Sequence, residues 1–436
     1  MATENNNKTL NVPNKREQSQ TCLGYAERKE QSPQGNVPNL RFPEFREEWE
    51  RIKVSALLEF YPTNSLSWEQ LDYSGEGIFN LHYGLIHKGL PTQVDVSENN
   101  LPTIKDEYIP KKMSLCQNGD VAFADASEDT NDVAKCIEFA NCDEQKIVCG
   151  LHTIHGRDTQ NKTVTGYKGY AFSARPFREQ IRRLAQGTKI YSINSHNFSE
   201  CYIGIPCKEE QSKISNLLHT IGLRIATQIK IIEDLKKLKS AITHLHFDAA
   251  IDKYYSAYIG DCIEQVSQRN KDGKVKEVLS VSNKNGFVNQ SEQFEDREIA
   301  SEDTSNYKVV HTNDFAYNPA RINVGSVARL HNYACGIVSP MYICFHTKPM
   351  LLPEYFEHIF STSYFRHEMH KRLEGSVRLC LTYDSLCNIK IALPSIDEQK
   401  QFVSQISAII SKIINEDRLL TLYQTLKRYL LSQMFI

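Results

Sequence analysis

The chain has 436 residues, and its 51 Lys and Arg against 53 Asp and Glu give a formal net charge of −2. Hydrophobic residues make up 40% and charged residues 24%, which is typical of a globular protein with cores to bury. These values exclude a wholly disordered chain and a strongly basic, histone-like binder, and the length indicates roughly two to four domains. No apolar run approaches the roughly 20 residues of a membrane span, so we expect no membrane association and no signal peptide.

The composition changes along the chain in a regular order. Residues 1–38 are rich in Asn, Gln, Lys, Glu and Ser and are predicted to form a disordered tail. The rest is predicted to form a first globular region at 39–205, a first long helix at 206–248, a second globular region at 249–393 and a second long helix at 394–436. Short β-type runs at 147–149 and 342–345, with short helices at 177–185 and 365–373, indicate that both globular regions are α+β.

The two halves resemble each other. Pro206–Gln211 is similar to Pro394–Gln399, and the register that this match defines holds without a gap from 177–247 onto 365–435. Further upstream, Gly119–Phe123 is similar to Asn313–Tyr317 at a slightly larger offset, which a loop of different length explains. The chain therefore reads as a pseudo-twofold internal repeat, in which each copy is a globular region followed by a long helix.

Both long helices have apolar residues at heptad spacing over about four heptads. The predicted seam residues are Ile214, Leu218, Ile221, Ile225, Ile232, Leu235 and Ile242 in the first helix and Phe402, Ile406, Ile409, Ile413, Leu420, Tyr423 and Leu430 in the second. Polar residues interrupt the seams at matching places, Gln228 with Glu416 and Lys239 with Lys427. We expect the two helices, each about 57 Å long, to pack as an antiparallel coiled coil between the globular regions. The alternative is that each helix packs on its own globular region or on a partner subunit.

A basic segment lies at 162–191, where seven basic residues against one acidic residue are interleaved with Tyr and Phe. Basic groups can pair with phosphates, and aromatic rings can meet bases, so this segment predicts a DNA contact; a solvated basic helix with core aromatics is the alternative. The candidate DNA-binding residues are Lys168, Arg175, Arg178, Arg182, Arg183 and Lys189 in the first copy and Asn318, Arg321, Arg366, Lys371, Arg372 and Arg378 in the second. The acidic stretch at 292–303 is expected to face away from nucleic acid.

No catalytic motif is complete. Asn318–Arg321 lacks the second Pro and the aromatic residue of an adenine-methyltransferase motif, and Gly75 with Gly77 is only a lone G-x-G. A P-loop is missing, and Asp397–Lys400 fits a helix cap better than a nuclease signature. We therefore predict no catalytic residue in this chain.

The potential metal ligands, Cys and His, do not have the spacing of a known metal-binding motif either. None of the twelve cysteines forms a C-x-x-C pair, and most lie in apolar runs, so we expect buried free thiols. His152 and His155 have the spacing of a metal pair, but no third ligand stands out, and both are predicted to be loop histidines. We predict no metal site.

Taken together, this order of segments resembles the specificity subunit of type I restriction-modification enzymes, over residues 37–436. The residues that carry the resemblance are Val37–Phe45 with Trp49, Gly119-Asp120, Asn313-Asp314, Pro206–Gln211, Pro394–Gln399, and Phe247 and Phe435 at the helix ends. Cys207 departs from the pattern, because a Ser-type cap is expected there.

The resemblance implies a non-catalytic subunit that binds double-stranded DNA in the cytoplasm. Each globular region would be a target-recognition domain for one half of a bipartite sequence, and the helices would set the spacing. Two methylation subunits would dock on the helices and bring S-adenosylmethionine, and motor-nuclease restriction subunits would use ATP and Mg. The chain itself would hold no cofactor. A coiled-coil scaffold without sequence-specific DNA reading, or a stand-alone DNA methyltransferase, are the alternatives.

Overall fold

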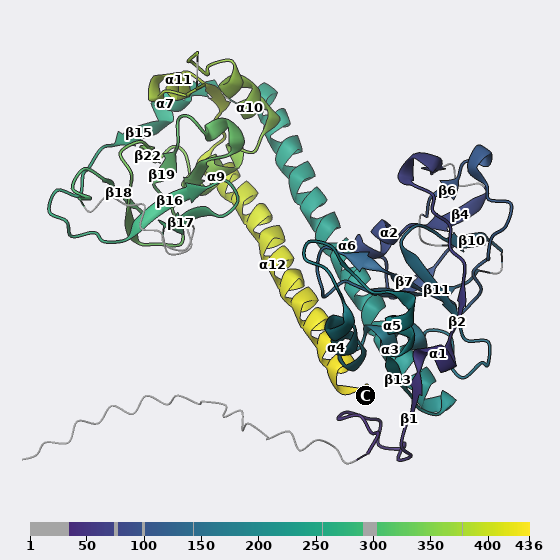
Figure 1. Ribbon diagram of the computed structural model, residues 1–436. Helices are drawn as coiled ribbons and strands as arrows, with labels where there is room; N and C mark the ends of the chain where they lie inside the picture. The colour runs from purple at the N-terminus through teal and green to yellow at the C-terminus, as the bar shows by residue number, and fades with distance from the viewer. Residues whose placement is uncertain are drawn as a thin grey trace, which may run out of the picture. The chain divides into compact units, whose positions relative to one another are not determined.

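The computed structural model describes residues 35–73, 77–97, 101–142, 144–254, 256–290, 303–376 and 378–436, with the side chains of 251–253 left out. It divides into two compact units, Met1–Ile214 with Leu431–Ile436, and Ser215–Leu430 (Figure 1). Most of the predicted tail at 1–38, and all of the acidic stretch at 292–303 except Asp303, lie outside the described residues. Both units mix helices with short strands, as the α+β prediction requires.

Two sheets form the centre of the first unit. The five-stranded sheet has the order β2 (Glu59–Tyr61), β11 (Thr153–Arg157), β7 (Val121–Ala124), β9 (Cys136–Ala140), β5 (Gln93–Asp95). The four-stranded sheet has the order β10 (Lys146–Cys149), β4 (Ile78–Leu81), β6 (Thr103–Ile104), β3 (Leu71–Asp72). All four residues of β7 are buried, which agrees with the continuous apolar run Val-Ala-Phe-Ala and with its central place in the sheet.

Smaller elements complete this unit. The two-stranded pairs are β1 (Glu50–Lys53) with β13 (Tyr202–Ile205), and β8 (Ala126–Ser127) with β12 (Tyr191–Ser192). The short helices are α1 (Val54–Leu57), α2 (Tyr83–His87), α3 (Tyr167–Ser173), α4 (Arg175–Leu184) and α5 (Ser195–Ser199). Helices α3 and α4 cover the sheet through aromatic rings, because Phe172 contacts both Phe123 and Phe177 at centroid distances of 4.9 and 4.8 Å.

The second unit also has two sheets. One has the order β15 (Ile263–Val266), β22 (Ile343–Thr347), β19 (Phe315–Tyr317), β20 (Val327–Arg329), and the other β17 (Gly286–Asn289), β16 (Val278–Ser282), β21 (Cys335–Val338), β18 (Lys308–His311). The remaining elements are the pair β14 (Ser256–Tyr258) and β23 (Lys390–Ala392), with α7 (Ile259–Cys262), α9 (Pro353–Ile359), α10 (Ser363–His370) and α11 (Tyr383–Cys387). Its core includes Phe315 stacked on Phe345 at 5.2 Å.

The long helices are α6 (Lys208–Lys253) and α12 (Ile396–Gln433). Helix α6 continues beyond the predicted boundary at 248, because Ala249 and Ala250 extend the helix without a breaker. Helix α12 begins at a capping box, in which the Ser395 hydroxyl accepts from the Glu398 amide and the Glu398 carboxylate accepts from the Ser395 amide. The short helices predicted at 177–185 and 365–373 correspond to α4 and α10, which each begin slightly earlier.

Within the second unit, α6 and α12 contact each other (Figure 1). Gln228 meets Glu416, and further along α6 the ring of His246 stacks on Phe402 at 4.1 Å, so the contacts run in opposite order along the two helices. Every predicted seam residue is buried or half-buried. By contrast, Leu238 and Leu426, which lie outside the predicted seam, are exposed.

Candidate nucleic-acid interface

Each unit presents a short helix followed by a closed loop. We call residues 175–192 the first helix-loop, made of α4 and the loop after it, and residues 363–380 the second helix-loop, which begins with α10. Gln186 and Ser192 exchange two backbone hydrogen bonds of 2.9 and 2.8 Å, and Glu374 and Cys380 do the same at 3.0 and 2.8 Å. The two loops are therefore closed at equivalent positions, in the same register that aligns Pro206–Gln211 with Pro394–Gln399.

A glycine opens each loop. Gly187 and Gly375 have φ of 145° and 123°, in the region that favours glycine. A Cβ atom at Gly187 would collide with the carbonyl oxygen of Ile190, and one at Gly375 would collide with that of Arg378. The tight turn thus requires glycine, and it holds the loop tips out to solvent, where Ile190 is 64% and Leu379 50% exposed.

The exposed cations of the first helix-loop lie opposite its buried face. Phe177 and Ile181 face the core, whereas Arg182, Arg183 and Lys189 are exposed and form no ion pair with any other described residue. Arg175 is also exposed but is paired with Glu179 at 2.7 Å, one helical turn away. Of the cations predicted in the first helix-loop, three are therefore exposed and unpaired. Phosphate contacts need cations that are accessible in this way.

Two predicted residues of the first copy are held by the fold. Lys168 is 3% exposed, lies 3.3 Å from the Glu138 carboxylate and donates to the Thr163 hydroxyl at 2.8 Å. A direct contact between Lys168 and DNA is therefore not supported, because its ammonium is a buried partner of a buried acid. Arg178 is half-buried and donates from Nη2 to the Asn131 carbonyl at 2.6 Å, so it positions α4.

The second helix-loop has a similar division. Arg366 and Arg378 are exposed, while Lys371 and Arg372 both pair with Glu368, Lys371 at 2.9 Å and Arg372 at 2.6 Å. Arg321 is exposed at the end of a separate loop. Asn318 is 7% exposed, and its side-chain oxygen accepts from the Ala320 amide at 3.1 Å, so it shapes that loop instead of facing solvent.

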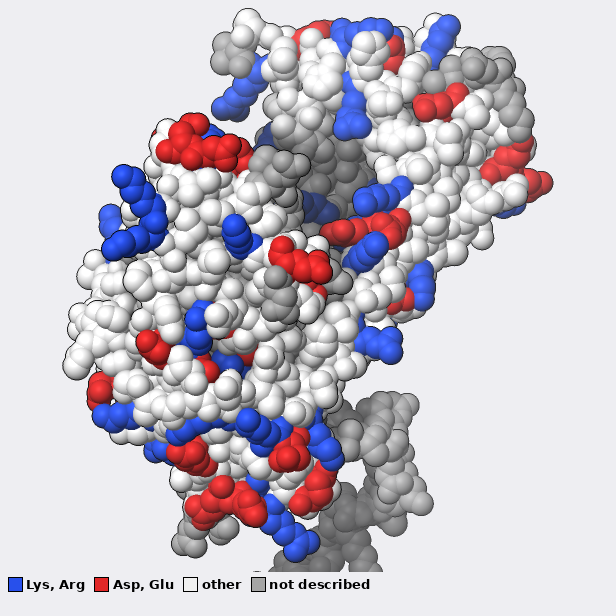
Figure 2. All heavy atoms as spheres, turned by 90° about the vertical axis from the view of Figure 1, so that its right-hand side faces the viewer, with Lys and Arg blue, Asp and Glu red and all other residues white. Residues whose placement is uncertain are grey.

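One face of the molecule carries charges of both signs among its described residues (Figure 2). Figure 2 shows Lys and Arg interspersed with Asp and Glu over the described part of that face, so charges of opposite sign neutralise one another there. A mixed surface of this kind gives a weak net field, which phosphate binding does not favour. The helix-loops are therefore the better candidates.

Two networks of buried charge lie in the first unit. Burial raises the pKa of Glu138, although Lys168 and the amides of Gly169 and Gly166 oppose that shift. Burial also acts to raise the pKa of Asp120, but hydrogen bonds from Arg157 and His155 outweigh it and leave the pKa lowered. The Glu138 carboxylate thus ties α3 to β9, and the Asp120 carboxylate ties β11 to the turn before β7.

Histidine placement was only partly predicted. His152 lies in a turn, with φ of 55°, and its Nδ1 lies 3.2 Å from Asp125. The prediction that His155 is a loop residue was wrong, because it lies in the middle of strand β11 between two paired strands. The pairing of Asp120 with Arg157 was not predicted, because it is a long-range contact without a local spacing signal.

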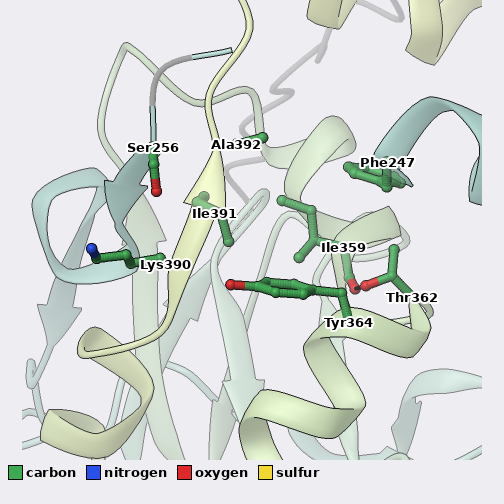
Figure 3. A pocket seen from close by; sticks show the side chains of 8 residues that line it. All are labelled: Phe247, Ser256, Ile359, Thr362, Tyr364, Lys390, Ile391 and Ala392. Atoms are coloured by element: carbon green, nitrogen blue, oxygen red, sulfur yellow. Dashed lines mark hydrogen bonds between the residues drawn. The ribbon is translucent and has the colours of Figure 1, made fainter. Parts of the chain in front are cut away.

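A small cavity in the second unit is not suited to a cofactor. It measures about 50 Å³ and is lined by Phe247, Ser256, Ile359, Thr362, Tyr364, Lys390, Ile391 and Ala392. Figure 3 shows Ile391 and Ile359 directed toward the ring of Tyr364 and the amine of Lys390 directed away from it. The Lys390 ammonium instead lies 5.1 Å from the ring of Tyr258. Cofactor-sized ligands need a pocket of roughly 300 Å³ or more.

No protein-family model matches the chain, and no curated protein matches it. Among the helices of the described residues, none combines the length and apolarity needed to cross a bilayer.

Solved structures do match. The S subunit of a type I restriction-modification system from M. genitalium has a TM-score of 0.53 and 15% identity, over 92% of this chain and 99% of that one. A chain from a study of complex assembly and conformational transition of the type I R-M system has a TM-score of 0.50 and 13% identity, over 88% and 96%. An HsdS subunit from Thermoanaerobacter tengcongensis matches at a TM-score of 0.41 and 14% identity, over 88% and 95%. The M. genitalium match, with a TM-score of 0.53, shows that the chain has the fold of type I restriction-modification S subunits.

Proposed function

We propose that this chain is the DNA sequence-recognition subunit of a type I restriction-modification complex and that it has no catalytic site of its own. The observation that carries the proposal is the likeness to an S subunit over 92% of the chain. A likeness over both units and both long helices favours this function over that of a scaffold that shares only the helices.

The first part of the proposal is a pseudo-twofold repeat. Gln211 is fully buried, donates to the carbonyls of Pro206 and Lys162, and accepts from the Val164 amide. Gln399 is equally buried and makes the same three bonds to Pro394, Met350 and Leu352. Each partner in the second set stands at the position that the repeat register assigns to its counterpart in the first. Matching long-range bonds of this kind support a duplicated plan, because unrelated regions have no reason to share them.

The second part is an antiparallel coiled coil that sets the distance between half-sites. The buried seam and the reversed order of contacts between α6 and α12 support it. A helix of about 38 residues spans about 57 Å, which equals roughly 17 base pairs at ~3.4 Å each and bounds the separation of the two recognition domains.

The third part is DNA reading by the two helix-loops. Arg182, Arg183 and Lys189 in one and Arg366 and Arg378 in the other are exposed cations beside glycine-opened loops. Cations and backbone amides would bind phosphates, and side chains of the loop tips would reach base edges. Each unit would read one half of a bipartite sequence. The protein would act in the cytoplasm.

The fourth part is docking of two methylation subunits on the long helices. Exposed apolar residues follow heptad spacing on α6, where Ile231, Leu238 and Leu245 are 38%, 48% and 71% exposed. On α12, Leu419 and Leu426 occupy the positions equivalent to Ile231 and Leu238 and are also exposed. Two equivalent apolar stripes suit two copies of one partner. S-adenosylmethionine would be bound by those subunits, and ATP and Mg by the restriction subunits that join them.

The proposal is tested by mapping adenine methylation in cells that carry this chain with its methylation subunit. We expect methylation at a split sequence with a fixed gap, and loss of that pattern when this chain is deleted. Methylation that persists without the chain, or S-adenosylmethionine turnover by the purified chain alone, would show that another function is correct.

A further inference from the structure

Three potential metal ligands meet inside the first unit. Cys116, Cys149 and His155 are 5%, 1% and 0% exposed, and their ligand atoms all lie within 4.8 Å of one another. The Sγ atoms of Cys116 and Cys149 are 3.6 Å apart. These residues come from three places in the chain, a loop, the end of β10 and the middle of β11, so the fold alone brings them together.

The backbone holds these residues firmly. The Cys116 amide donates to the Ile147 carbonyl at 2.8 Å, and Leu115 pairs with Val148, which places Cys116 beside the strand that ends at Cys149. His155 is paired on both sides within the five-stranded sheet, with Tyr61 on one side and Ala122 on the other. The three side chains therefore do not depend on a flexible loop for their positions.

Asp120 orients the imidazole. The Asp120 carboxylate accepts from His155 Nε2 at 2.8 Å and also from Arg157 Nη2 at 2.7 Å, Arg157 Nε at 2.8 Å and the Gln117 amide at 2.9 Å. An acceptor with these partners is ionised, so His155 carries its proton on Nε2. In the neutral imidazole the other nitrogen, Nδ1, is an acceptor. It is buried with no hydrogen-bond partner among the described residues.

An orphaned buried imidazole nitrogen is costly unless something binds it. Two thiolates and a neutral imidazole suit zinc, and a carboxylate that accepts from the far ring nitrogen is the usual support of a metal-bound histidine. Two sulfur ligands at ~2.3 Å from a tetrahedral zinc lie about 3.8 Å apart, close to the separation seen here. A disulfide would need the sulfur atoms to be ~2.0 Å apart.

The second unit offers an internal comparison. Its Asp314 carboxylate accepts from the His311 amide at 2.7 Å, as that of Asp120 does from Gln117, so the acidic turn is present in both units. Strand pairing then identifies the equivalent positions: Ala122 lies opposite His155, and Ala316 lies opposite Cys344. By the same strand registers, Val310 and Val338 stand where the first unit has Cys116 and Cys149. The second unit therefore forms this arrangement of strands with a ligand-type residue, Cys344, at only one of the three positions, which argues for a separate role of the full set in the first unit.

We propose that Cys116, Cys149 and His155 bind one zinc ion, with Asp120 as the residue that positions His155. Water would be the fourth ligand, because Cys149 also lines a surface pocket of about 560 Å³ with Asn64, Ser65, Met113 and Ser114, which provides an entry path. The ion would join β10 of the four-stranded sheet to β11 of the five-stranded sheet and thus brace the two halves of this unit.

The test is metal analysis of the purified full-length chain after passage over a chelating resin. We expect about one zinc per chain, and loss of zinc in Cys116→Val and in Cys149→Val, which introduce the residue found at the equivalent site of the second unit. The matched control is Cys136→Val, a buried cysteine of strand β9 outside the cluster, which should keep its zinc.

Cobalt supplies a second measurement that does not depend on how well the variants fold. Replacement of zinc by Co²⁺ in the wild-type chain should give thiolate charge-transfer absorption together with the visible bands of a tetrahedral ion. A wild-type chain without stoichiometric metal, or one with a disulfide between Cys116 and Cys149, would overturn the proposal. So would cysteine variants that keep as much zinc as the wild type.

Discussion

Gln228 of α6 and Glu416 of α12, which the repeat register predicts to be equivalent, contact each other. The side-chain amide of Gln228 donates to the backbone carbonyl of Glu416 at 3.3 Å and also to its carboxylate, which Lys412 contacts as well. In two equivalent antiparallel helices, only residues beside a twofold axis meet their own counterparts. This pair therefore supports the proposed pseudo-twofold arrangement and would lie beside its axis.

This pair provides the first prediction. Polar residues on an apolar seam fix register at some expense of stability. We expect the double variant Gln228→Leu with Glu416→Leu to melt a few degrees above the wild type. The single variant Gln228→Leu should melt below the wild type, because it leaves the Glu416 carboxylate facing a leucine. Thermal unfolding followed by circular dichroism measures the wild type and both variants, and a double variant less stable than Gln228→Leu would contradict this reasoning.

Sequence periodicity predicted the long helices because an amphipathic pattern sustained over several heptads has few other solutions. The sheets were harder to predict, since their short strands carry too little alternation. Lys168 was predicted to bind DNA because amino-acid composition does not distinguish a solvated lysine from one that is buried against Glu138. The cluster around His155 was missed because Cys116 and Cys149 become its neighbours only through strand pairing.

The second prediction concerns the glutamine that anchors α12. Gln399→Leu would leave the Leu352 amide and the carbonyls of Met350 and Pro394 without their side-chain partner. Unsatisfied buried backbone groups cost about 1–3 kcal/mol each, and we expect the second unit to lose about 3 kcal/mol in its free energy of unfolding. Urea titration measures the change. Gln401→Leu, on the exposed side of the same helix, is the matched control and should change little.

The third prediction is a pH dependence set by His358. Burial, with Lys239 and Arg329 nearby, lowers the pKa of His358 from 6.5 to about 4. Because the unfolded chain takes up a proton at higher pH than the folded chain, stability is complete above about pH 6.5. It then falls until about pH 4, by up to about 3 kcal/mol.

Denaturant titrations across that pH range measure the effect. The variant His358→Gln should flatten the curve between pH 6.5 and 4. His367→Gln, which replaces an exposed histidine on α10, should leave the curve as it is in the wild type. Equal slopes for the wild type and His358→Gln would show that another group titrates there.

The fourth prediction tests the first helix-loop as a DNA-contacting surface. Arg182→Glu with Arg183→Glu should weaken DNA binding by the assembled complex, because two exposed phosphate partners become repulsive. The slope of log affinity against log salt should fall by about 2. Fluorescence anisotropy at several salt concentrations gives both values. Lys111→Glu with Lys112→Glu changes charge by the same amount at another exposed place and is the control. Unchanged DNA affinity in the arginine variant would show that the DNA-contacting surface is not the first helix-loop.

The last prediction tests the long helices as a spacer. Deletion of residues 225–231 together with 413–419 removes one heptad from each helix, and the two segments face each other about the contact between Gln228 and Glu416. Both seams stay in phase, so the shortened pair should still fold. One heptad of helix spans about 10.5 Å, and the gap between methylated half-sites should shorten by about three base pairs. Deletion of 225–228 with 413–416 breaks the heptad phase and should prevent assembly. A methylation map with an unchanged gap in the one-heptad variant would mean that the helices do not set the spacing.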